Sequence, residues 1–245
     1  MATIVIPRRR LRYRPRGPAG YAGGMCGRYT LRSTPKALRE HFRLAEEPTL
    51  FPPRFNVAPT QPVPAVRFYP AAGRRLDVLR WGLVPRWSRD IGDGFINARS
   101  ETAADKPSFR DSLRRRRCLI PADGFYEWAR LGGRKRPFHF SLWGGGPFAF
   151  AGLWDSWQGA GWGEVETCAV LTTEANELVR PAHDRMPVIL APWHYGLWLD
   201  PAVQDPRELA PLLWPYPSEE LRAVPVGPRV NNPHHDDPGC LDPAA

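Results

Sequence analysis

Residues 63–81 read VPAVRFYPAAGRRLDVLRW. Within this stretch, two runs rich in aliphatic and aromatic side chains, Val63–Tyr69 and Leu76–Trp81, lie on either side of a turn signal at Ala72-Gly73. Such a pattern is typical of a β-hairpin, in which the two strands run antiparallel. The chain around it has no regular alternation of strands with helices, so parallel βαβ units are not indicated.

Short elements of both kinds are expected on either side of this hairpin. Ser33-Thr34-Pro35 is typical of a helix start, and Leu38 and Phe42 lie four residues apart on the helix that follows. A helix over 109–117 is expected to precede an apolar strand that begins at Cys118. Further elements are predicted as strands at 26–31, 168–172 and 188–190, paired strands at 138–143 and 148–154 around Gly144-Gly145-Gly146, a helix capped by Thr173 that ends before Pro181, and a short helix over 193–199.

The composition is that of a globular protein with an irregular chain path. The 245 residues suffice for one large domain or two small ones, and 42% of them are hydrophobic. The 29 prolines favour short elements, so the expected class is α+β with a mainly antiparallel, barrel-like β-sheet and short flanking helices. No apolar run approaches the roughly 18 residues that a membrane span needs.

The four cysteines are scattered along the chain as Cys26, Cys118, Cys168 and Cys240. None forms a Cys-x-x-Cys pair, which argues against a zinc site and against a dense disulfide framework. We therefore expect no metal ion, no cofactor and a reducing, cytoplasmic location, associated with the nucleoid if the source is bacterial.

The net charge of +9 is unevenly distributed. Residues 1–24 contain six Arg and no acidic residue, so the remainder carries only +3. Almost all cations are Arg, which pairs bidentately with phosphate and stacks on bases, although a general compositional bias toward Arg also accounts for the excess.

The segment ahead of Met25-Cys26 differs from the rest of the chain. It is rich in Arg, Pro and Gly, lacks an amphipathic period, and its apolar start is too short for a signal peptide. We interpret residues 1–25 as a disordered or mis-annotated extension that is removed before Cys26, with Met25 favoured as the true initiator.

Cys26 becomes chemically distinctive once Met25 is removed. The product carries an α-amine and a thiol on one residue, with reference pKa values of about 7.7–8.0 and 8.5, so both are partly unprotonated near neutrality. Such an aminothiol condenses with an aldehyde, because the amine forms a Schiff base and the thiol then closes a five-membered thiazolidine. The alternative is a buried structural cysteine, the usual fate of a free thiol.

Asn97-Ala98-Arg99 and Glu127 are further candidates. On a strand, Asn97 and Arg99 face the same side, where the amide could hold a reacting group and the guanidinium a phosphate. The alternative is a strand end with a surface pair between Arg99 and Glu101. Glu127 lies within an aromatic stretch that follows an Asp-Gly turn, and desolvation raises the pKa of such a carboxylate, which suits acid–base catalysis. The alternative for Glu127 is an exposed residue on an edge strand.

The stretch from Pro181 to Pro187 contains His183 and Arg185. A loop stiffened by proline is a common place for a catalytic group, and His can transfer protons near pH 7. Arg185 again suits a phosphate. The alternative is a His that packs the loop through backbone hydrogen bonds.

Aromatic and cationic residues accompany these candidates in the sequence. Bases stack on aromatic rings and Arg neutralises the backbone, which is how proteins line a channel for single-stranded nucleic acid. The residues in question are Trp81, Arg86, Trp87, Arg99, Trp128 and Arg185.

Taken together, the motifs resemble the SRAP (SOS-response-associated peptidase) family, whose members cross-link to abasic sites in single-stranded DNA. The matching stretches, in family order, are MCGRYT at Met25, FNVAPTQ at Phe55, WGLVPRW at Trp81, INARSET at Ile96, RRCLIPADGFYEW at Arg116, TTEAN at Thr172, HDRMPVIL at His183 and RVNNP at Arg229. The resemblance implies a domain over 26–233, followed by a flexible tail at 234–245, and a protein that acts as a monomer.

The resemblance also implies roles for individual residues. Cys26 matches the nucleophile that forms the thiazolidine with the open-ring sugar, Asn97 the residue that positions it, Glu127 the acid–base residue, and His183 the residue that assists proton transfer and adduct reversal. The implied contacts to DNA are the Arg28, Arg99 and Arg185 guanidinium groups, the Trp81 and Trp128 rings, and Lys106 in place of a basic contact that falls near Pro107.

Two other functions stay open at this point. Cys26 and His183 could form the nucleophile–base pair of an N-terminal-cysteine peptidase, with self-cleavage after Met25. A non-covalent nucleic-acid binder would instead be sensitive to salt and indifferent to the aldehyde.

Overall fold

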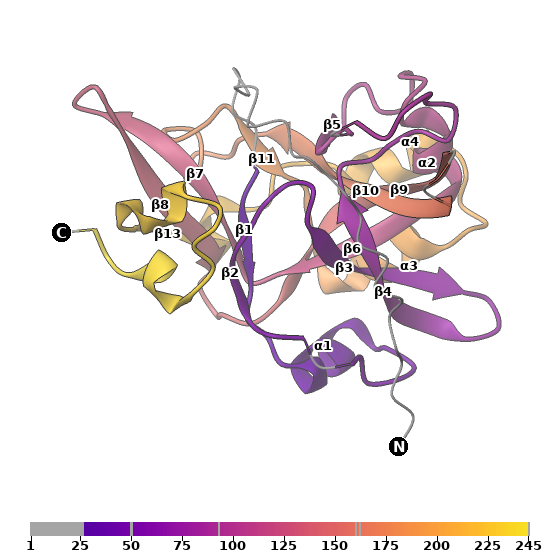
Figure 1. Cartoon of the computed structure of the whole chain (residues 1–245), viewed down its shortest axis with the longest axis horizontal. Coiled ribbons are helices and arrows are strands. Elements are labelled where there is room, and N and C mark those ends of the chain that lie inside the picture. The colour runs from indigo at the N-terminus through magenta and orange to yellow at the C-terminus, as the bar shows by residue number, and fades with distance from the viewer. Residues whose placement is uncertain (1–26, 50, 93, 160, 162, 245) are drawn as a thin grey trace.

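The computed structural model describes residues 27–49, 51–92, 94–159, 161 and 163–244, and these fold into two β-sheets with short helices at their edges (Figure 1). The smaller sheet has the strand order β13-β8-β7-β1-β2. Its strands are β1 (Tyr29–Leu31), β2 (Arg54–Val57), β7 (Gly124–Leu131), β8 (Arg134–Leu142) and β13 (Leu221–Pro225).

The larger sheet closes on itself. Its strands are β3 (Pro62–Tyr69), β4 (Gly73–Trp81), β5 (Asn97–Arg99), β6 (Arg117–Ala122), β9 (Phe148–Gly159), β10 (Gly163–Glu174), β11 (Arg185–Pro187) and β12 (Ile189–Leu190). Following the pairings β10–β4–β3–β6–β9 returns to β10, because β9 and β10 also pair. Among the described strand pairs only β10–β4 and β10–β5 are parallel. The predicted class, α+β with a mainly antiparallel, barrel-like sheet, is confirmed, as is the hairpin at 63–81.

Helices are short and lie at the sheet edges. They are α1 (Pro35–Phe42), α2 (Arg110–Arg115), α3 (Tyr195–Leu199) and α4 (Pro206–Leu209), with 3-10 turns η1 (Pro192–His194), η2 (Ala210–Leu212), η3 (Ser218–Glu220), η4 (Pro228–Asn231) and η5 (Pro238–Leu241). The predicted start of α1 is confirmed, because the Thr34 side chain accepts a hydrogen bond from Ala37 N at 3.2 Å. No helix in the described part of the chain has the length and apolar character to cross a bilayer.

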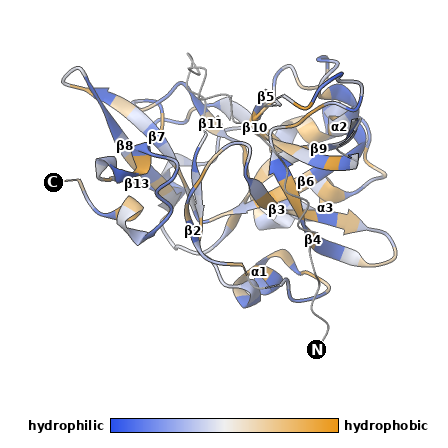
Figure 2. Ribbon diagram, in the orientation of Figure 1, coloured by the Kyte–Doolittle hydropathy of each residue, from blue (hydrophilic) through white to orange (hydrophobic). Residues whose placement is uncertain are grey.

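Apolar residues are concentrated on the strands that form the barrel, as the hydrophobic colour along β3, β6 and β9 shows (Figure 2). Val66, Leu119 and Ala151, from these three strands, are fully buried. Burial of apolar surface stabilises such a core by about 25 cal/mol per Å² and is the dominant stabilising contribution. The barrel therefore supplies the rigid body on which the candidate site is built.

The predicted pairing of 138–143 with 148–154 is wrong. Both segments are strands, but β8 pairs with β7 and β13, whereas β9 pairs with β6, β10 and β12. The glycine-rich link carries the chain from one sheet to the other. Gly145 and Gly146 have φ angles of 67° and 79°, a region open to glycine without strain.

Two further predictions are corrected. The helix expected after Thr173 is absent, because β10 continues to Glu174 and Asn176 then closes one turn by accepting from Val179 N at 3.0 Å. Residues 234–244 are not a flexible tail. Cys240 is fully buried in this segment, and the Asp236 carboxylate accepts from the backbone of β2 at Asn56 N, 2.8 Å away.

Asp123 ties the corner between β6 and β7 to the start of α1. Its buried carboxylate accepts hydrogen bonds from Arg32 N, from Ser33 N at 2.9 Å and from Ser33 Oγ at 2.5 Å. In addition, Asp123 N donates to Thr30 O at 2.7 Å. One carboxylate thus holds the chain that leaves β1 against the neighbouring strand.

Replacing this carboxylate should destabilise the whole domain. Asp123→Ala leaves three donors without their acceptor, and we expect the free energy of unfolding to fall by about 2–4 kcal/mol, measured by urea denaturation. Ser33→Ala, which removes only one of the three bonds, should cost about 1 kcal/mol. An Asp123→Ala protein within about 0.5 kcal/mol of the parent would refute the anchoring role.

His139 is buried beneath β1 and requires a glycine opposite it. Its Nε2 lies 3.1 Å from Thr30 Oγ1, and a Cβ added at Gly124 would come within 2.2 Å of the same nitrogen. Burial, together with the charges of Arg32 and Arg222, lowers the pKa of His139 to about 3. The ring is therefore neutral in the folded protein at all ordinary pH values.

This depressed pKa makes stability depend on pH in a defined direction. Between the ordinary pKa of about 6.5 and the folded value, the unfolded chain binds a proton that the folded protein does not, so stability falls as pH falls. His139 should contribute a loss of about 2 kcal/mol between pH 7 and pH 5. Unfolding titrations of His139→Gln at both pH values should show that much less pH dependence than the parent, and an unchanged dependence would contradict the assignment.

Candidate functional site

The start of β1 lies directly beside β7. Cys26 lies outside the described residues, and Gly27 is the first residue that the structure describes. Tyr29 pairs with Phe125 in antiparallel register, and Tyr126 N donates to Arg28 O at 3.0 Å. Continued by two residues, this register places Gly27 opposite Glu127.

Glu127 is buried, with 3% of its surface exposed. Its strand β7 lies between β1 and β8, so the alternative of an exposed residue on an edge strand is wrong. Because side chains alternate along a strand, Glu127 lies on the face of Phe125, which stacks on Phe140 in the core, and not on the face of Trp128. A buried carboxylate of this kind is a candidate for proton transfer.

Asn97 and Arg99 are held at the far end of β10. They belong to β5, which pairs in parallel with β10 so that Asn97 faces Val170 and Arg99 faces Thr172. Asn97 is buried and Arg99 is exposed, and Arg99 has no side-chain partner among the described residues. The two side chains share one face of the strand, as the sequence predicts.

The start of β1 and the start of β5 are linked through one buried tryptophan. The Trp81 ring packs edge-on against Tyr29 with a centroid distance of 5.4 Å, and its Nε1 donates to Ile96 O at 2.8 Å. Tyr29 directly follows Arg28, and Ile96 directly precedes Asn97. Trp81 is only 2% exposed, so the prediction that it contacts nucleic acid is wrong, because a ring closed off from solvent cannot stack on a base.

Arg185 lies across the same strand end, but it is engaged internally. Its guanidinium forms a bidentate pair with Glu101 at 2.7 and 2.8 Å and donates to Thr172 O at 2.6 Å. Desolvation opposes ionisation of Glu101, but the hydrogen bond and charge of Arg185 outweigh it and lower the pKa of Glu101. The predicted Arg99–Glu101 surface pair is thus replaced by Glu101–Arg185, which fixes the start of β11.

His183 lies two residues before Arg185, in a loop and not directly after a helix. Arg185 N donates to His183 Nδ1 at 2.9 Å, and Asp184 Oδ1 lies 3.0 Å from the same nitrogen. A backbone N–H can only donate, so the contact with Arg185 N uses Nδ1 as an acceptor, whereas the contact with the Asp184 carboxylate uses it as a donor. Both contacts engage Nδ1, and Nε2 of the half-buried ring is left for another partner.

The Arg28 and Trp128 side chains both donate hydrogen bonds to residues of η4. Arg28 donates to Val230 O at 2.9 Å and to Asn56 Oδ1 at 3.1 Å, and burial lowers the pKa of its guanidinium. The half-buried Trp128 donates from Nε1 to Asn231 Oδ1 at 2.7 Å. Both side chains are thereby oriented while part of each stays accessible.

Lys106 and Trp87 are further exposed members of the candidate set. Lys106 lies in a turn after β5, where its backbone N donates to Thr102 O at 3.0 Å. Trp87 lies in the loop after β4 and is 62% exposed. It provides the accessible aromatic ring that Trp81 cannot.

The other three cysteines are buried and have no disulfide partner among the described residues. Burial raises the pKa of Cys118 to about 12 and also raises the pKa values of Cys168 and Cys240. Such thiols are poor nucleophiles, because the reactive species is the thiolate. The described residues also contain no cluster of three or more His, Cys, Asp or Glu residues suited to a metal ion.

Sequence reasoning overlooked the residues that support this site. Asn56, fully buried, donates from Nδ2 to Val230 O, Asn232 O and His235 O at 3.2, 3.1 and 2.8 Å. Asn231 orients Trp128, as described above. Asn56 lies within the stretch FNVAPTQ and Asn231 within RVNNP, so the motifs themselves indicated both residues. Their contacts span more than 100 residues of sequence, and such contacts cannot be read from the sequence.

Comparisons with known proteins agree with this architecture. The family described as SOS response associated peptidase (SRAP) matches residues 25–233. The abasic site processing protein YoqW of Bacillus subtilis (strain 168) is 41% identical over 223 residues, which cover 89% of this chain and 99% of that protein. The abasic site processing protein HMCES of Gallus gallus is 34% identical over 191 residues, which cover 67% of this chain and 56% of that protein.

A solved structure extends the similarity to the fold. The X-ray crystal structure of a protein from Bacteroides thetaiotaomicron superimposes with a TM-score of 0.79 at 26% identity, covering 90% of this chain and all of that one. The family match spans most of the sequence, and the motifs it includes are those that form the site described above. The chain therefore belongs to the SOS response associated peptidase (SRAP) family.

Proposed function

We propose that this protein processes abasic sites in DNA, and that it does so by trapping the lesion in single-stranded DNA as a covalent thiazolidine on Cys26. The coarser part of this proposal, a role in abasic-site processing, follows from its relatives, several of which are named abasic site processing proteins. The chemistry and the strand preference are inferred from the residues of the site.

The observation that carries the proposal is the convergence of buried polar groups on the start of β1. The register of β1 and β7 places Glu127 opposite Gly27, and Trp81 joins Tyr29 to the residue before Asn97. Glu127 and Asn97 are both buried, and a buried carboxylate in such a position is a candidate for proton transfer. Cys26 directly precedes Gly27 in the sequence, which is why we assign the nucleophile to this end of β1.

The proposed reaction requires two bonds to one carbon. The α-amine of Cys26 adds to the aldehyde carbon of the ring-opened sugar, and loss of water gives the Schiff base. The thiol then adds to the same carbon and its proton passes to the nitrogen, so the ring closes with one water released overall. Glu127 is suited to transfer the protons of ring opening and closure, and Nε2 of His183 is suited to exchange a proton with the sugar oxygen.

Binding of the strand is assigned to the accessible groups around this point. Arg99 and Arg28 carry charge for phosphates, while Trp128 and Trp87 offer ring faces to bases. Lys106 lies on the same connection after β5 and supplies a further charge. Arg185 is assigned a smaller share, because Glu101 already neutralises its guanidinium.

The family description supports a second activity at the same site. A peptidase acting on its own chain would cleave between Met25 and Cys26, with Glu127 opposite the adjoining Gly27. Intact-mass analysis of full-length protein separates the two routes to a free Cys26. Removal of the extension that depends on Glu127 supports self-cleavage, and removal that persists in Glu127→Gln points to a host protease.

The covalent step can be tested with protein that begins at Cys26. We expect a heat-stable cross-linked band with a single-stranded oligonucleotide that carries an abasic site, and no such band with Cys26→Ser, which keeps the amine but loses the thiol. Cys240→Ser is the matched control and should cross-link normally. An undiminished band from Cys26→Ser would exclude the thiazolidine.

The binding step can be tested through its salt dependence. Arg99→Gln should weaken binding of an intact single-stranded oligonucleotide and flatten the slope of log K against log salt by about 0.7, the value for one phosphate contact. Arg207→Gln is the matched control, because it removes the same charge from α4. Arg207 is 91% exposed there and paired with Asp205. Equal slopes for the parent and Arg99→Gln would remove Arg99 from the interface.

A further inference from the structure

The loop that carries Trp87 is fixed at nearly every residue except Trp87 itself. On the side of β10, Val84 N donates to Thr167 Oγ1 at 2.9 Å. At the end of the loop, Ser88 N donates to Pro85 O at 2.8 Å, and Ser88 O accepts from Trp157 Nε1 on β9 at 2.9 Å. A ring with 62% of its surface exposed therefore projects from a rigid support.

Asp155 provides the central contact in this support. Its carboxylate, with 4% of the side chain exposed, accepts from Arg86 N at 3.1 Å and from Arg86 Nε and Nη2 at 3.2 and 3.1 Å. Ser156 N donates to the same carboxylate at 2.9 Å. Both the backbone and the side chain of the residue before Trp87 are thus bound by one buried group.

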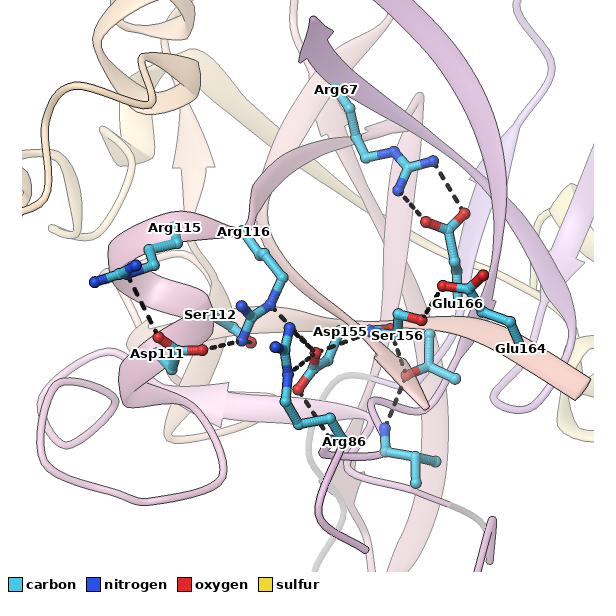
Figure 3. Close-up of polar contacts among 12 residues, drawn as sticks. Arg67, Arg86, Asp111, Ser112, Arg115, Arg116, Asp155, Ser156, Glu164 and Glu166 are labelled. Carbon is cyan, nitrogen blue, oxygen red and sulfur yellow. Dashed lines mark hydrogen bonds and ion pairs between the residues drawn. The ribbon is translucent and has the colours of Figure 1, made fainter. Parts of the chain in front are cut away.

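A second arginine approaches Asp155 from α2. Figure 3 shows Arg86 and Arg116 converging on Asp155, while Asp111 bridges Arg116 and Arg115. Arg116 Nε lies 3.2 Å from Asp155 Oδ1, and Asp111 Oδ2 lies 2.5 Å from Arg116 Nη2. Two guanidinium groups therefore share the buried carboxylate, which compensates the cost of its burial.

We propose that Asp155 is a positioning residue for nucleic-acid binding, which holds the Arg86–Ser88 turn so that Trp87 presents its ring to a base. This inference rests on the proposed function and adds to it a residue that does not touch the strand. Its effect is pre-organisation: a ring that is already fixed loses less conformational freedom when a base stacks on it.

For Asp155→Asn, the change in charge and the loss of turn geometry are expected to have opposite effects on binding affinity. Asp155→Asn adds one net positive charge, so simple electrostatics would tighten binding to a polyanion. Loss of the turn geometry should instead weaken it. Asp111→Asn makes the same charge change on the same ion-pair chain without a contact to the Trp87 loop, and it serves as the matched control.

The test is a double-mutant cycle with Trp87→Ala, read by fluorescence anisotropy on an intact single-stranded oligonucleotide. We expect Trp87→Ala to weaken binding about tenfold and Asp155→Asn about fivefold, with no further loss when they are combined, whereas Asp111→Asn binds as well as the parent or better. Trp157→Phe, which keeps an aromatic side chain but replaces the indole and so deletes the donor to Ser88 O, provides a milder variant. It should weaken binding, with no further loss when it is combined with Trp87→Ala.

Additive losses, or tighter binding by Asp155→Asn, would overturn the positioning role. If Asp155→Asn does not fold, as judged by circular dichroism, the Trp157→Phe cycle decides the question by the same criterion. An unaltered affinity of Trp87→Ala would also refute the inference. Because the oligonucleotide has no aldehyde, these outcomes are independent of the covalent reaction, which fails or succeeds separately with the abasic substrate.

Discussion

The architecture of the site depends on how the first described strand is docked between the two sheets. β1 pairs with β7 and β2 in the smaller sheet, while Tyr29 packs against Trp81 and Phe150 of the barrel at centroid distances of 5.4 and 5.8 Å. This contact fixes the direction in which the chain enters the fold. An N-terminal residue can act as a reagent only if its backbone is held in this way, because a frayed terminus has no defined geometry.

β10 provides the second constraint, because it continues beyond the barrel. Its first half closes the barrel against β9 and β4, and its last residues pair with β5 and β11. Asn97, Arg99 and the anchored Arg185 therefore share one strand end although the sequence separates them by more than 80 residues. Asn97 is thus positioned by the barrel, whereas Glu127 lies on β7 of the smaller sheet, between β1 and β8.

Much of this could be anticipated from local signals. The hairpin at 63–81, the cap at Thr34 and the strand that bears Asn97 and Arg99 follow from turn residues and from alternation, which are local properties. The pairing of strands from different parts of the chain does not follow from such local properties. The sequence suggests that 138–143 and 148–154 pair, because nothing local distinguishes a hairpin from a crossing between sheets. Likewise, Trp81 and Trp87 belong to one motif, yet only burial separates a core ring from an accessible one.

The central claim is that Cys26, as a free N-terminal residue, holds the lesion through both sulfur and nitrogen. Mass spectrometry of the peptide cross-linked to an abasic oligonucleotide tests this most directly. The account predicts an adduct on a peptide that begins at Cys26, with the mass of the two components less one water and no change on treatment with borohydride, since a thiazolidine has no C=N bond to reduce. An adduct on a peptide that still extends upstream of Cys26, or on another residue, would contradict it.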